Sequence, residues 1–93
     1  WRNGDLALVP NPVHTHAAAL ISYRLPSEGE PILALFSLDG GRVASWQPGE
    51  QPAGEGQVRV QLEQAPGVYI LALTESMDGH TVLVATFKVA ILP

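Results

Sequence analysis

Short apolar segments alternate with turn residues along the whole chain, at intervals of about ten residues. This spacing is typical of an antiparallel β-sandwich, and helical periodicity is not sustained anywhere in the sequence. The pattern predicts an all-β, immunoglobulin-like sandwich of about seven strands. The predicted strands are Leu6–Val9, Ala18–Arg24, Pro31–Leu38, Arg42–Trp46, Gln57–Leu62, Val68–Thr74 and Thr81–Leu92.

The predicted strands differ in how many of their faces are apolar. The segment QVRVQLE alternates strictly, so Val58, Val60 and Leu62 are expected to face the core while the residues between them face water. The segments ILALFSL and VYILAL are apolar on both parities, which is typical of central strands whose outer face is also covered. The cover is either a part of the same domain or a partner, and the sequence leaves both alternatives open.

Turn residues support this division of the chain. Glycines at Asp39–Gly41 and Ser76–His80 supply the positive φ that tight turns need. Between Trp46 and Val58, the segment QPGEQPAGEGQ is too rich in Pro, Gly and Glu for a strand, so we expect a long exposed crossover. Tyr69 follows a Pro-Gly turn and is predicted to form a tyrosine corner, in which its hydroxyl bonds to the backbone at the end of the sandwich.

Length and composition limit the kind of protein. The 93 residues suffice for one domain, expected over residues 6–93, with residues 1–5 as the remnant of a linker to a longer protein. The net charge is −4 and the five Lys and Arg residues are dispersed, so nucleic acid is not an expected partner. The chain has no cysteine, which excludes disulfides and thiolate metal sites.

Candidate chemistry is sparse. His14 and His16 would lie on the same side of an extended segment and could bind zinc or copper together with His80 or a carboxylate, but no third ligand is fixed, and exposed histidines are the preferred interpretation. Motifs for calcium, phosphate or a nucleophilic serine are absent, so we expect neither an enzyme nor a cofactor. Trp1 and Trp46 could stack on sugar rings, although packing for Trp46 and a linker position for Trp1 are favoured.

Four segments in order, LVPNPV, LFSLDGGRV, APGVYILAL and TFKVAIL, carry a family resemblance. Together they resemble the immunoglobulin-like C-terminal sorting domain of type IX secretion cargo in the Bacteroidetes and relatives. Hook-capping immunoglobulin-like modules share part of this pattern. The matching positions are Pro10, Asn11, Pro12, Gly40, Arg42, Gly67, Val68, Tyr69 and Lys88.

The resemblance implies a non-catalytic address tag at the end of a larger exported protein such as a hydrolase. Such a domain would fold in the periplasm, bind the outer-membrane translocon and its sortase, and leave the cargo at the cell surface or outside the cell. The alternative is an accessory immunoglobulin-like spacer or carbohydrate-binding module of a secreted glycoside hydrolase. Weak self-association through an uncovered edge strand is also left open.

Overall fold

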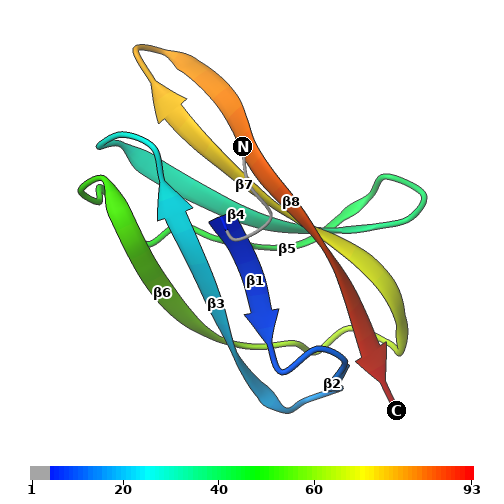
Figure 1. Cartoon of the computed structure of the whole chain (residues 1–93). Coiled ribbons are helices and arrows are strands. Elements are labelled where there is room, and N and C mark those ends of the chain that lie inside the picture. Colours follow the sequence, from blue (N-terminus) through cyan, green and yellow to red (C-terminus); the bar gives the residue numbers. More distant parts are fainter. Residues whose placement is uncertain (1–4) are drawn as a thin grey trace.

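The computed structural model describes residues 5–93, so the predictions for Trp1 and for most of the linker remnant lie outside the described residues. The described residues contain no α-helix, and therefore no helix long and apolar enough to cross a membrane. Strands account for most of the chain (Figure 1). They are β1 (Leu6–Val9), β2 (Val13–His14), β3 (Ala18–Leu25), β4 (Glu30–Ser37), β5 (Arg42–Trp46), β6 (Gly54–Gln61), β7 (Gly67–Met77) and β8 (His80–Leu92).

The strands form two packed sheets (Figure 1). The three-stranded sheet has the order β1-β3-β6, and the five-stranded sheet has the order β2-β8-β7-β4-β5. Neighbouring strands are antiparallel except β2 and β8, which run parallel. The predicted all-β sandwich is confirmed, with eight strands in place of about seven.

The predicted strand bounds hold closely except that β7 continues to Met77 where an end at Thr74 was predicted, and two further corrections concern β2 and β6. The extra strand β2 is only two residues long and forms where Val13 and His14 pair with the end of β8, a contact that no local pattern encodes. The predicted crossover after Trp46 is also shorter than expected, because β6 begins at Gly54. Its first residues pair with the end of β3, and this pairing outweighs their low strand propensity.

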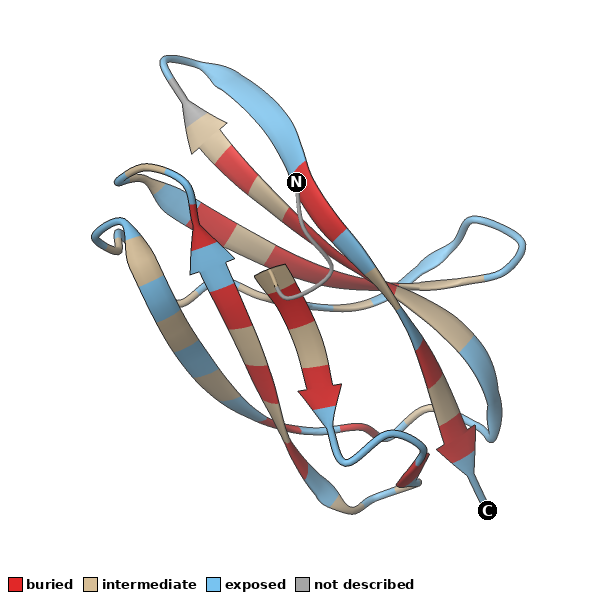
Figure 2. Cartoon of the chain, in the orientation of Figure 1, coloured by how far each residue is buried: buried red, intermediate tan, exposed pale blue. Residues whose placement is uncertain are grey.

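The core lies between the two sheets, where buried and exposed residues alternate along the strands (Figure 2). On β6, Val60 is buried and Val58 packs against the core, and Leu62 just after the strand is buried, which confirms the predicted inner face. Leucines from β4 and β7 complete the centre. The fully buried large apolar side chains are Leu6, Ile21, Leu25, Leu33, Leu35, Leu62, Leu71, Leu73, Val13, Val89 and Pro31.

Candidate functional site

Asn11, between Pro10 and Pro12 in the LVPNPV segment, forms two side-chain hydrogen bonds with the last strand, β8. Its side-chain amide nitrogen donates to the carbonyl oxygen of Lys88 over 3.1 Å, and its side-chain oxygen accepts from the backbone nitrogen of Ala90, also over 3.1 Å. The side chain thereby makes the donor and acceptor contacts that a neighbouring strand would make. Asn11 and Lys88, two family-matching positions far apart in sequence, are thus held together at the edge of β8 that faces away from β7.

Tyr69 anchors the turn that leads into β7. Its hydroxyl donates a hydrogen bond of 2.6 Å to the carbonyl oxygen of Ala65, and its ring packs against the core. This is the bond predicted for a tyrosine corner. Gly67 and Val68 are exposed at the start of the strand, so this motif has a structural part in Tyr69 and a surface part in Val68.

Gly40 and Arg42, two of the positions that match the family, lie at the tight turn between β4 and β5. Gly40 has a φ of 95°, and the Ser37 nitrogen donates to the Gly41 carbonyl over 2.9 Å. The Asp39 carboxylate accepts from the Ser37 hydroxyl and from the Gly41 nitrogen. These two hydrogen bonds, the hydroxyl's first, lower the pKa of Asp39. The turn thereby sets Arg42 as the first residue of β5.

Four residues from four strands make one row across the outer face of the five-stranded sheet. Phe36 on β4 lies opposite Arg42 on β5 and opposite Ile70 on β7, and Ile70 lies opposite Lys88 on β8. Directly opposed residues share a face of the sheet, so the order across the row is Arg42, Phe36, Ile70, Lys88. Three strand spacings separate the two cationic positions by about 14 Å at the backbone. We call these four residues the cationic row.

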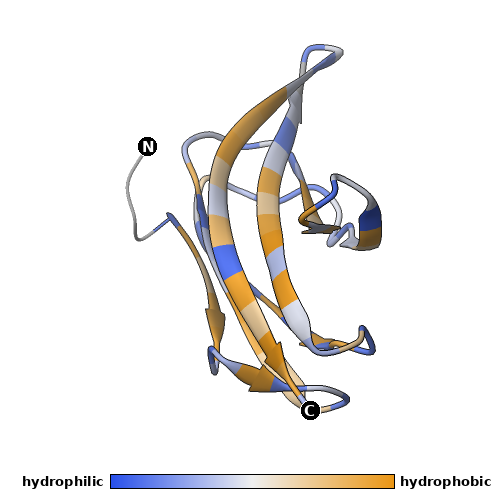
Figure 3. Cartoon of the chain, turned by 90° about the vertical axis from the view of Figure 1, so that its right-hand side faces the viewer, coloured by the Kyte–Doolittle hydropathy of each residue, from blue (hydrophilic) through white to orange (hydrophobic). Residues whose placement is uncertain are grey.

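Hydrophobic residues predominate along the long strands β7 and β8, which carry two members of the cationic row (Figure 3). The next row contains Ala34 and Ala72, which are 8% and 7% exposed. Val68 lies on the same face, on the other side of the row, and is 37% exposed. Two packed sheets make up the described strands, so none of those strands lies over this face. Among the described residues, neither Arg42 nor Lys88 forms an ion pair.

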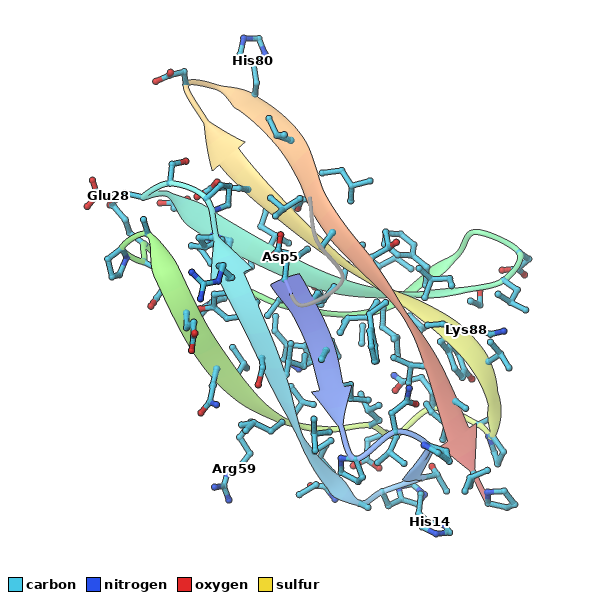
Figure 4. All side chains as sticks on the ribbon, in the orientation of Figure 1. Asp5, His14, Glu28, Arg59, His80 and Lys88 are labelled. Atoms are coloured by element: carbon cyan, nitrogen blue, oxygen red, sulfur yellow. The ribbon has the colours of Figure 1, made fainter. Side chains whose placement is uncertain are left out.

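The outer face of the three-stranded sheet is polar at the end where β3 finishes and β6 begins. Arg24 and Glu55 form an exposed ion pair there, with 2.9 Å between the Arg24 Nη2 and Glu55 Oε2 atoms. The adjacent surface hollow of about 220 Å³ is lined by Ser22, Tyr23, Arg24, Glu55, Gly56 and Gln57. Arg59 on β6 and Lys88 on β8 belong to different sheets, and their side chains lie on opposite sides of the sandwich (Figure 4). Within residues 5–93 the two faces of the sandwich therefore differ in chemistry: two unpaired cations flank apolar residues on the five-stranded face, whereas a single unpaired cation, Arg59, lies beside Val9 and Leu20 on the three-stranded face.

The histidines are not brought together. His14 and His80 lie at opposite ends of the sandwich (Figure 4). The His14 Nδ1 contacts the carbonyl oxygen of Pro93 over 3.1 Å, whereas His16 contacts the carboxylate of Glu63. Among residues 5–93, no group of three or more His, Asp or Glu side chains is placed to hold a metal ion.

Trp46 lies on the inner side of the five-stranded sheet. It pairs with Leu33, which is fully buried, and packs against the core in a partly buried position. Its ring is therefore not part of an exposed sugar-binding platform. The structure agrees with the favoured prediction, in which Trp46 packs within the domain.

Sequence reasoning identified the two ends of the cationic row but not its middle. Arg42 and Lys88 came from the motif match, whereas Phe36 and Ile70 came only as members of strands that are apolar on both parities. The missing information was the register of β4 against β7. That register depends on the pairing of residues more than thirty positions apart and is not encoded in either segment alone.

Comparisons with known proteins add no assignment. No protein-family model matches this chain, and no curated protein matches it.

Proposed function

We propose that this chain is a C-terminal sorting domain of the type IX secretion kind. It would direct a larger bacterial protein through the periplasm to the cell surface or the medium. The resemblance of the four motif segments supports the family. The observation that supports a recognition role is the cationic row, because two motif positions, Arg42 and Lys88, flank apolar residues on one exposed face.

We assign a structural role or a recognition role to family-matching residues from their positions in the domain. Asn11 and Tyr69 satisfy backbone groups within the domain, so they maintain its shape. The side chains of Arg42 and Lys88 form no ion pair within the described residues and are exposed, so their charges are available to a partner. An apolar patch edged by cations suits a protein surface of matching shape that carries acidic groups at its rim. The translocon and its sortase are the proposed partners.

Export of a fused reporter tests the proposal. The chain is placed at the C-terminus of a periplasm-tolerant reporter in a host with an active type IX system, and the reporter is measured in the periplasm, at the surface and in the medium. We expect the wild-type fusion outside the cell. Arg42→Glu and Lys88→Glu together should reduce the external fraction by about tenfold or more, since each reversal places like charges across the interface.

The control for the charge reversal is Arg59→Glu. Arg59 is exposed, makes no ion pair among the described residues and lies on the opposite sheet, so its reversal should leave export unchanged. Circular dichroism melts of each purified domain establish that folding is intact. Retention of the folded wild-type fusion in the periplasm would instead favour the accessory spacer. Equal export of all variants would show that the cationic row has no part in recognition.

A further inference from the structure

The last strand has a long stretch of edge that no other strand among residues 5–93 pairs with. β8 is 13 residues long and pairs with β7 on one side over almost its whole length. On the other side, β2 pairs only with Ile91 and Leu92, and the Asn11 side chain bonds the backbone at Lys88 and Ala90. Among the described residues no strand pairs with this side of β8 from His80 to Thr86.

The open edge can donate hydrogen bonds to another strand and accept hydrogen bonds from it. A two-residue turn at Asp78 and Gly79, both with positive φ, places Met77 opposite His80. Residues that flank such a turn bond to each other, and bonding then alternates along the hairpin. The backbone groups of Thr81 and Leu83 consequently point away from β7, towards the open edge.

The other edges of the sandwich are protected in ways that proteins commonly use. The edge strand β1 has four residues and is followed by Pro10, and β2 has two. β5 has five residues and begins with Arg42, while β6 carries glycines and the charged Glu55 and Arg59. The open part of β8 has no charged residue from Thr81 to Phe87, and it exposes 47% of Val82 and 58% of Leu83. The one irregularity in the pairing of β8 with β7 is a bulge at Val84, between Leu83 and Ala85.

We infer that this edge of β8 pairs with the same edge of a second copy of the chain. An antiparallel pair that uses the open stretch from His80 to Thr86 has its midpoint at Leu83. The two Leu83 side chains would then lie side by side, and Val82 would also lose contact with water. Burial of these exposed apolar groups favours association, and the paired backbone groups add to it.

Charge favours a second copy over an unrelated strand. In this arrangement the exposed Asp78 at the hairpin tip of each copy reaches the end of the open stretch of the other copy, where Lys88 lies next to the Asn11 side chain. The contact occurs twice because the pair has twofold symmetry. Self-association would thus engage Lys88, so the monomer is the form that presents the whole cationic row. The inference is independent of the proposed function.

Cysteine cross-linking tests the pairing directly, since the chain has no native cysteine. Leu83→Cys places one thiol on the twofold axis, where opposed backbones come within disulfide reach of about 5.5 Å. We expect it to form a disulfide-linked dimer at least about tenfold faster than Leu38→Cys under the same mild oxidation. Leu38 is a matched control because it is 69% exposed but lies in the β4–β5 turn, away from β8.

Sedimentation equilibrium measures the association without a cross-link. Leu83→Lys opposes two like charges at the axis and should raise the dissociation constant by about tenfold or more, whereas Leu38→Lys should not change it. A wild-type chain that stays monomeric up to about 1 mM would overturn the inference and leave the proposed function untouched. A dimer that Leu83→Lys does not weaken, or equal cross-linking of both cysteine variants, would overturn it as well, because the contact would then lie elsewhere.

Discussion

The hydroxyl of Tyr69 lies 2.6 Å from the carbonyl oxygen of Ala65, four residues earlier in the chain. This bond fixes the turn that leads from β6 to β7. Tyr69→Phe keeps the ring and removes the donor, so the free energy of unfolding should fall by about 1 kcal/mol. Urea unfolding midpoints measure the change, with an unchanged m-value as the sign that only stability was altered.

Tyr23→Phe is the control for this prediction. The ring of Tyr23 is also packed in the core, but no hydrogen bond of its hydroxyl is seen among the described residues. At pH 7 the control should change the free energy of unfolding by less than Tyr69→Phe does. Equal midpoints for the wild type and Tyr69→Phe would contradict the role of the corner.

Asn11 contributes two hydrogen bonds to the edge of β8. Asn11→Ala removes both partners from the Lys88 carbonyl and the Ala90 nitrogen, and these exposed groups can then bond to water. We expect a loss of about 1–2 kcal/mol in the free energy of unfolding. Asn11→Asp keeps an acceptor for Ala90 but faces the Lys88 carbonyl with a negative charge, so it should not restore stability. Denaturant unfolding of both variants checks this, with Thr86→Ala, a truncation of an exposed side chain on the same strand, as the control.

Local pattern was sufficient for most of the fold. The alternation in β6 correctly gave a strand with one face in water, and the two-sided apolar character of β4 and β7 correctly gave two central strands. The prediction failed where pairing with a distant strand decided the outcome. β2 exists because Val13 and His14 meet β8, and β6 extends back to Gly54 because Leu25 lies opposite.

The candidate site divides in the same way. The motif match identified Arg42 and Lys88, but only the register of four strands placed them in one row with Phe36 between. The role of Asn11 was also outside the reach of sequence reasoning. The Asn11 side-chain amide donates a hydrogen bond to the carbonyl oxygen of Lys88, 77 residues further along the chain, and nothing in the LVPNPV segment specifies that contact.

Gly56 is required by the aromatic ring beside it. A Cβ atom at this position would lie 2.4 Å from Cζ of Tyr23, which is directly opposite on β3. Gly56→Ala forces the buried ring or the strand to move and should destabilise the domain by about 1–3 kcal/mol. Gly41→Ala is the control, since its nearest contact would be 3.4 Å from the Ser37 hydroxyl oxygen. Thermal melts of the two variants compare them, and an equal melting temperature would contradict the steric argument.

Tyr23 should make the fold sensitive to alkaline pH. Burial raises the pKa of its hydroxyl above the ordinary value, because the charged phenolate is poorly solvated in the core. In the unfolded chain the group loses its proton near pH 10, while the folded chain still holds it. The unfolded state then binds fewer protons, so the free energy of unfolding falls as pH rises.

The pH prediction is checked by comparing the wild type with Tyr23→Phe from pH 7 to pH 11. The contribution of Tyr23 is fully present below about pH 10 and is lost as pH rises through the folded-state pKa. Tyr23→Phe removes the titrating group, so its stability should decline less steeply above pH 10 than that of the wild type. Parallel curves would show that the hydroxyl reaches water in the folded domain and that burial does not control its ionisation.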